Sequence, residues 1–124
     1  MIGGMISLYG IPNCDTVKRA RTWLDGHGVA YRFHDFKKEG VPGPALDQWL
    51  GALGWEALVN RRGTTWRRLD DAARAAVVDS ASARAALLAN PSLIKRPVAE
   101  WPGGETTAGF DPADWAARAG ATAQ

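Results

Sequence analysis

The stretch MISLYGIPNCDTVKRARTWL, residues 5–24, determines the fold class that the sequence predicts. Its first six residues, 5–10, are an apolar run ended by glycine, which is typical of a buried strand. A helix is expected to begin near Cys14 or Asp15, because apolar residues then recur at helical spacing. Those apolar positions are Val17, Ala20 and Leu24. Residues 31–36 alternate with period two and predict a second strand, so the opening is a βαβ unit with parallel strands and a right-handed crossover.

The middle of the chain predicts helices and no strand. Apolar positions at residues 46–53 indicate one helix, and residues 69–77 indicate another. Residues 60–68 are polar, basic and contain a glycine, which favours a loop. Ser80 is a suitable N-cap for a further helix through Leu88.

The C-terminal part returns to strands and ends in a helix. Residues 93–98 predict a strand that carries a proline, and residues 106–110 are its expected hairpin partner. Asp111 is placed to cap a last helix that ends at about Ala119. The order is an α/β layer with a helical insertion at about residues 43–90.

Composition limits the function classes. The 124 residues are the size of one domain, covering residues 1–124, and 46% hydrophobic with 23% charged residues is typical of a soluble globular protein. A net charge of +2 does not indicate a nucleic-acid partner. No apolar stretch reaches the ~18 residues of a membrane span, and no signal peptide is apparent, so we expect a cytoplasmic protein. A single cysteine excludes an intramolecular disulfide and a multi-cysteine zinc site.

That cysteine, Cys14, falls where the first loop enters a helix. The partial positive charge and free N–H groups of a helix start favour the thiolate. Lys18 and Arg21 follow along the same stripe of the helix, and Lys18 is placed to lean toward the sulfur, whereas Asp15 opposes the negative charge. The alternative is a small buried side chain without chemistry, which is the commoner role of a lone cysteine.

Basic and aromatic residues are the other candidates. The cluster of Arg61, Arg62, Arg67 and Arg68 is interpreted mostly as a solvated face. Three of the six tryptophans, Trp23, Trp49 and Trp115, occur in helical patterns and are expected to pack in the core, while Trp66 is a possible site residue.

Three motifs together carry a resemblance to a known family. These are YGIPNCDTVK at residues 9–18, WEALVNRRGTTW at residues 55–66 and IKRP at residues 94–97. In this order they resemble the ArsC/Spx family, and within it the YffB-type arsenate-reductase-like branch. The resemblance covers about residues 5–118 and implies a thioredoxin-like fold, βαβ…ββα, with the helical insertion between the second and third strands.

The resemblance also implies roles for individual residues. Cys14 would be the nucleophilic thiol, and Pro97 would be the cis-proline that faces it. Arg62 and Arg96 would hold an oxyanion or the thiol adduct. The predicted substrate- and anion-binding residues are Arg62, Arg96, Asn13 and Lys18, and no metal ligand is expected.

Two departures from the family pattern shape the predicted function. Arsenate-reducing members carry a third arginine beyond the Arg-Pro motif, but residues 98–109 contain none. Val17 stands where a second cysteine would complete Cys-x-x-Cys, so the resolving thiol must come from outside. We therefore expect a thiol-dependent reductase that has no bound cofactor and is linked to glutathione or a glutaredoxin. Its substrate is expected to be a small oxyanion or a disulfide. The protein is expected to be a monomer without nucleic-acid or membrane partners. The alternative is a non-enzymatic Spx-like regulator that binds RNA polymerase.

Overall fold

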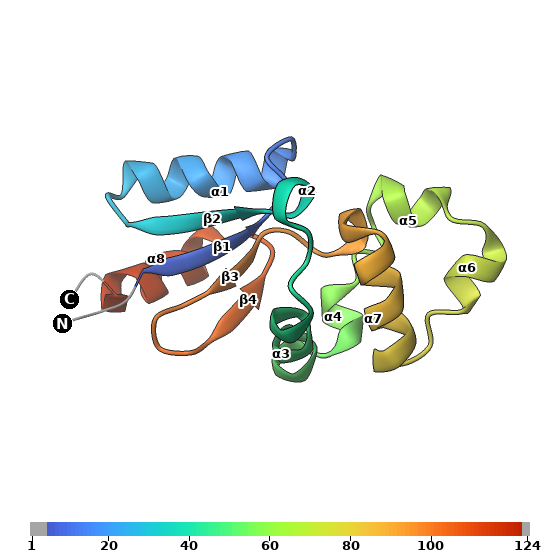
Figure 1. The fold of residues 1–124 in the computed structure, drawn as a ribbon. Helices are drawn as coiled ribbons and strands as arrows, with labels where there is room; N and C mark the ends of the chain where they lie inside the picture. Colours follow the sequence, from blue (N-terminus) through green and yellow to red (C-terminus); the bar gives the residue numbers. More distant parts are fainter. Residues whose placement is uncertain (1–4, 123–124) are drawn as a thin grey trace. The chain divides into compact units, whose positions relative to one another are not determined.

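The computed structural model describes residues 5–122 and contains a mixed four-stranded sheet. The strands are β1 (Ile6–Gly10), β2 (Tyr31–Asp35), β3 (Val98–Glu100) and β4 (Thr106–Ala108). They lie in the order β2-β1-β3-β4, as Figure 1 shows. β1 and β2 are parallel, whereas β3 is antiparallel to both β1 and β4. This arrangement confirms the predicted α/β class and the thioredoxin-like order of elements.

The chain divides into two compact units. The first unit holds the residues up to Phe36 together with those from Arg96 onward, and the second holds Lys37–Lys95. The sheet belongs to the first unit, with helices α1 (Asp15–Gly26) and α8 (Pro112–Thr122). Six helices and a 3-10 turn lie between β2 and β3: α2 (Phe36–Glu39), α3 (Gly43–Leu53), α4 (Trp55–Leu58), α5 (Thr64–Arg68), α6 (Asp71–Ala75), α7 (Ser80–Ala89) and η1 (Pro91–Leu93).

Helices α1 and α8 pack on the same face of the sheet. Side chains alternate along a strand, so Ile6 and Leu8 of β1 point to one face. The buried cluster on that face consists of Ile6, Leu8, Ala20, Leu24, Ala99, Trp101 and Trp115. Trp115 is 1% exposed and meets Phe110, Trp101 and Trp23 edge to face, with ring centroids 4.8, 5.3 and 6.1 Å away. Such aromatic pairs contribute about 0.5–1.5 kcal/mol each beyond their buried area.

Helices α7 and α8 each have an aspartate as the N-cap residue. Asp111 accepts hydrogen bonds from the backbone N–H groups of Ala113 and Asp114 at 3.1 and 3.3 Å, which confirms it as the cap of α8. In α7 the cap is Asp79 and not the predicted Ser80, because the longer carboxylate one residue earlier reaches the N–H of Ser82 at 2.8 Å. Hydrogen bonds from the backbone and hydroxyl of Ser82 lower the pKa of Asp79.

Four predicted elements have other bounds in the structure. Residues 60–68 are not wholly loop, since Thr64–Arg68 forms α5. The helix predicted over residues 69–77 is only α6, because Asp70 accepts from the N–H of Ala73 at 2.7 Å and starts the helix after Leu69.

The strand predicted over residues 93–98 begins only at Val98. Pro97 precedes it and has no N–H to donate to the sheet, while Ile94 forms an isolated bridge with Val59 instead. The last helix continues three residues beyond its predicted end, to Thr122. Among the residues described, no helix has the length and apolar character needed to cross a membrane.

Candidate functional site

The thiol of Cys14 lies at the N-terminus of α1. Cys14 is the N-cap residue, with an extended backbone (φ −144°, ψ 124°), and its carbonyl accepts from the N–H of Lys18 at 2.9 Å. No side-chain hydrogen bond caps this helix end, and the thiol is free and half-buried. The cap side chain normally accepts from the first-turn N–H groups, so these N–H groups have no side-chain acceptor at this helix end.

The close approach of α1 to β1 sets the position of this thiol. Val17, in the first turn of α1, is completely buried against the end of the strand. A Cβ atom on Gly10 would lie 3.0 Å from Cγ2 of Val17, so only glycine fits there without a shift. The chain then passes from Gly10 to Cys14 in a short connection.

The Arg96–Pro97 segment lies at the same end of the sheet. Tyr9 pairs with Val98 in the antiparallel register of β1 and β3, so the residues before Val98 lie beyond the end of β1, where the chain turns toward Cys14. The Arg96–Pro97 peptide bond is cis, which is the isomer that the resemblance implied. Arg96 is half-buried, and its buried Nε has no hydrogen-bond partner among the described residues. A buried guanidinium donor without an acceptor is the arrangement expected where an anion binds.

The other predicted polar residues of the first unit differ in their surroundings. Asn13 and Lys18 are exposed on either side of Cys14 in sequence. Arg21 is not directed along the stripe toward the thiol, because its Nε donates to the Tyr31 hydroxyl at 3.1 Å and its guanidinium lies 4.2 Å from the centre of the Phe33 ring.

Arg118, which also belongs to the first unit, forms ion pairs with two carboxylates. Arg118 pairs with Asp114 at 2.8 Å and Glu105 at 2.9 Å, and the Asp114 hydrogen bond is the main cause that raises its pKa. Arg118 therefore does not supply the third anion-binding arginine that residues 98–109 lack.

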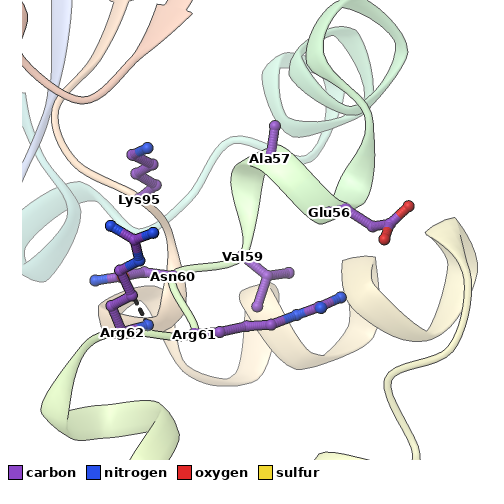
Figure 2. A pocket seen from close by; sticks show the side chains of 7 residues that line it. All are labelled: Glu56, Ala57, Val59, Asn60, Arg61, Arg62 and Lys95. Atoms are coloured by element: carbon purple, nitrogen blue, oxygen red, sulfur yellow. Dashed lines mark hydrogen bonds between the residues drawn. The ribbon is translucent and has the colours of Figure 1, made fainter.

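Arg62 belongs to the second unit, where it lines an open pocket of about 390 Å³ (Figure 2). The lining residues are Glu56, Ala57, Val59, Asn60, Arg61, Arg62 and Lys95. These lining residues come from two segments far apart in sequence. The N–H of Asn60 donates to the Leu93 carbonyl at 2.8 Å, and the N–H of Lys95 donates to the Leu58 carbonyl at 2.8 Å.

The loop that carries Arg62 is held by its own contacts. The Asn60 side-chain oxygen accepts from the N–H of Arg62 at 3.2 Å, drawn as the dashed line in Figure 2. The Arg62 carbonyl in turn accepts from Arg67 at 2.8 Å. A Cβ atom on Gly63 would lie 2.7 Å from Nδ2 of Asn60, so glycine is needed for the amide to keep this position.

The structure thus separates the predicted residues into two groups. Asn13, Cys14, Lys18, Arg96 and Pro97 share the first unit, and Arg62 lies in the second. Sequence reasoning did not single out Asn60 or Lys95, and it counted Arg61 with a solvated face. The side chain of an asparagine often accepts a hydrogen bond from the backbone N–H two residues later and so forms a turn, and this tendency points to Asn60. The pairing that brings Lys95 to the pocket has no such local signal.

The guanidinium of Arg61 lies near two tryptophan rings. Its guanidinium carbon lies 5.2 Å from the Trp55 ring centre and 6.0 Å from that of Trp66. Trp66 does not line the pocket itself. Trp49 and Trp115 are buried in the core and Trp23 packs against it, as predicted. Over residues 5–122, no three His, Cys, Asp or Glu side chains are grouped so that they could hold a metal ion.

Comparisons with known proteins identify a family, relatives and structural neighbours. The model of the ArsC family matches residues 9–118. A solved YffB protein is 50% identical, with a TM-score of 0.86 over 93% of this chain and 99% of its own. An ArsC-related protein from Brucella melitensis is also 50% identical, with a TM-score of 0.73 over 92% and 93% of the two chains. The global transcriptional regulator Spx of Streptococcus agalactiae is 29% identical over 76% of this chain and 69% of its own. The chain belongs to the ArsC family.

Proposed function

We propose that this protein is a thiol-dependent oxidoreductase that acts through Cys14 and uses glutathione as its co-substrate. The observation that carries the proposal is the free, half-buried thiol at an uncapped helix N-terminus. Membership of the ArsC family and similarity to an arsenate-reductase-related protein support the reaction class. The protein would need no bound cofactor and would act in the cytoplasm as a monomer.

The proposed reaction is thiol–disulfide exchange. The Cys14 thiolate attacks one sulfur of a disulfide, the old S–S bond breaks, and the other sulfur leaves as a thiolate. Cys14 is then half of a mixed disulfide. Val17 occupies the position of a resolving cysteine, and the chain has one cysteine in all, so a thiolate of glutathione or a glutaredoxin must attack the mixed disulfide. That second exchange releases the Cys14 thiolate and forms a new disulfide between the attacking thiol and the other half of the substrate.

Arg96 and Arg62 are each proposed to bind an anionic group, each within its own unit. Arg96 has the unpaired buried Nε, and Arg62 lies in the pocket of the second unit. Arginine suits carboxylates because its planar fork donates two parallel hydrogen bonds. Asn13 and Lys18, which are exposed beside Cys14 in the sequence, are proposed as further anion-binding residues. With Arg118 paired to two carboxylates, we favour glutathione-linked chemistry over arsenate reduction.

Intact mass spectrometry tests the proposal directly. Treatment of the reduced protein with glutathione disulfide is expected to give a monomer that carries one glutathione and returns to the free protein with glutathione plus glutaredoxin. Cys14→Ser is the control and should give no adduct. Formation of only a disulfide-linked dimer, or no product under forcing conditions, would refute the glutathione mechanism.

The similarity to Spx supports a second candidate, a regulator that binds RNA polymerase without catalysis. Retention of this protein by the C-terminal domain of the polymerase α subunit, together with no turnover of glutathione disulfide, would favour that function over the enzyme.

A further inference from the structure

A groove of about 370 Å³ lies beside α1 in the first unit, and we call it the α1 groove. Its lining residues are Lys18, Arg19, Thr22, Trp23, Phe110 and Pro112. Two of them are aromatic, one is proline and two carry a positive charge, whereas none carries a negative charge. The groove thus joins an apolar surface to two cations, and none of its apolar residues has a role in the proposed reaction.

Other rings hold the aromatic walls of the α1 groove in place. The Trp23 ring stacks on that of His27 with centroids 4.0 Å apart. Trp115, which is 1% exposed, meets the rings of Phe110 and Trp23 edge to face. Trp23 and Phe110 are themselves half-buried, so part of each ring remains accessible. Such a preformed wall loses little entropy when a ligand side chain packs on it, which favours binding.

The cations of the α1 groove favour an acidic ligand. Lys18 and Arg19 are exposed, and within residues 5–122 neither forms an ion pair or a side-chain hydrogen bond. Asp111 follows Phe110 in sequence but does not line the groove, and its carboxylate accepts hydrogen bonds from the first turn of α8. A carboxylate next to a bulky apolar side chain therefore complements both the charge and the apolar surface of the groove.

The α1 groove extends away from the thiol along the helix. Each helical residue rises about 1.5 Å, so Lys18 and Trp23 lie about 6 and 14 Å beyond Cys14 along the axis. Phe110 directly follows Gly109, whose N–H donates to the Pro97 carbonyl at 2.9 Å. An extended polypeptide spans about 3.3 Å per residue, so about four residues cover the distance from the thiol to the aromatic walls. A polypeptide can thus occupy the groove while its sulfur reaches Cys14.

We propose that the α1 groove binds a polypeptide segment in which a bulky apolar side chain, above all an aromatic one, stands next to acidic residues. Aromatic anchors in preformed pockets carry much of the binding energy of protein interfaces. A disulfide-bonded cysteine about four residues from this anchor lies within reach of Cys14, so the substrate is a disulfide of a protein. The docking is independent of Cys14, and only the reaction of the disulfide rests on the proposed function.

Docking is tested by NMR on the full chain with Cys14→Ser, so that no covalent chemistry takes place. The probe is a peptide with one phenylalanine between glutamates, and the indole N–H signal of Trp23 reports its binding. A peptide with alanine in place of phenylalanine is expected to bind about tenfold more weakly, the effect of burying one aromatic side chain. A peptide with lysines in place of the glutamates is expected to leave the signal unshifted.

Matched variants separate the groove from general charge. Arg19→Gln is expected to weaken the glutamate peptide about two- to fivefold, the range of an exposed ion pair. Arg32→Gln is the control, because Arg32 is an exposed arginine of β2 that does not line the groove. Thr22→Glu should weaken binding several-fold more than the equally long Thr22→Gln, since the new carboxylate repels the peptide. Arg19 and Thr22 are exposed on α1, so these variants retain the fold.

The reaction is tested on native Cys14 with the glutamate and alanine peptides, each extended to a cysteine four residues away that is disulfide-bonded to thionitrobenzoate. Attack of the Cys14 thiolate on the peptide sulfur forms a Cys14–peptide disulfide and breaks the original S–S bond, so thionitrobenzoate leaves as a coloured thiolate. The peptide with phenylalanine is expected to react about tenfold faster below saturation, in proportion to its affinity.

Each result decides the proposal. Equal affinities for the glutamate and lysine peptides, or equal losses in Arg19→Gln and Arg32→Gln, would overturn the groove as an acidic docking site. A Trp23 signal that moves with protein concentration in the absence of peptide would show a second copy as the occupant instead. Equal reaction rates for the two peptides would refute the protein-disulfide substrate. Peptide binding without reaction of Cys14 toward any disulfide would uphold the groove and refute the proposed function, whereas a glutathione adduct without peptide binding would do the opposite.

Discussion

Gly10→Ala tests how the packing of α1 on β1 positions the reactive thiol. The new Cβ atom would lie 3.0 Å from Cγ2 of Val17, where carbon atoms at optimal contact are about 3.5–4.0 Å apart. Val17 is completely buried and cannot turn into solvent, so the first turn of α1, which carries Cys14, must move. Gly10 does not have a positive φ, so alanine adds no backbone strain of its own.

The magnitude follows from two opposing effects. Overpacking a core costs about 1–3 kcal/mol, and alanine returns about 0.4–1 kcal/mol by restricting the unfolded chain. Gly10→Ala is therefore expected to lower the free energy of unfolding by about 1–2 kcal/mol. Val17→Ala alone removes two buried methyl groups at about 0.8 kcal/mol each and leaves a cavity, so it should cost about 2 kcal/mol or more. In the double variant the added methyl group occupies the space that Val17 vacated, and the overpacking disappears.

A double-mutant cycle measured by urea unfolding checks this reasoning. Tryptophan fluorescence follows the transition, and far-UV circular dichroism confirms that it is two-state. A favourable coupling of about 1–3 kcal/mol between the two substitutions is expected. If the two effects add within about 0.5 kcal/mol, or if Gly10→Ala alone stabilises the protein, the close contact does not control the position of α1.

Three further substitutions have expected outcomes. Asp79→Ala should lower the urea midpoint at pH 7 but much less at about pH 2. The folded-state pKa of Asp79 is depressed below 3.8, so the stability that its carboxylate contributes is present above that value. This stability is lost as the pH falls through the folded-state pKa. An equal loss at both pH values would contradict the capping role. Trp115→Ala should cost about 3–5 kcal/mol by chemical unfolding, since this ring is 1% exposed among three other aromatics, and a loss below about 1 kcal/mol would show that the cluster relaxes. Gly63→Ala should displace the amide of Asn60, break its hydrogen bond with the N–H of Arg62 and lower the urea midpoint while far-UV circular dichroism stays unchanged; an unchanged midpoint would mean that the amide adjusts without loss.

The opening βαβ unit was predictable because its signals are local. An apolar run, apolar residues at helical spacing and alternation with period two indicate β1, α1 and β2 in turn, and a βαβ unit implies the parallel pairing. The cap at Asp111 was predictable for the same reason. The four- and five-residue helices α4 and α5 were not predictable, because one turn is too short for a periodic pattern.

For the site, the sequence placed Cys14 at a helix start and pointed to the Arg96–Pro97 segment, and the register of β1 with β3 puts both at one end of the sheet. Their roles in the reaction remain predictions. Arg21 was expected on the stripe of the thiol, but Tyr31 and Phe33 of β2 hold it elsewhere. A side chain's partner on another element is not contained in its spacing along its own helix.

The sequence by itself determined the fold class, the helix start at Cys14 and the resemblance to the ArsC family, since each depends on neighbouring residues or on an ordered set of motifs. Only the tertiary structure decided which charged groups are available to a ligand. The pairing of residues 58–60 with residues 93–95 brings Lys95 to the pocket of Arg62, and the carboxylates of Asp114 and Glu105 occupy Arg118. Contacts between residues so far apart in the chain form only when folding closes the intervening loop, and no local pattern of side chains encodes them.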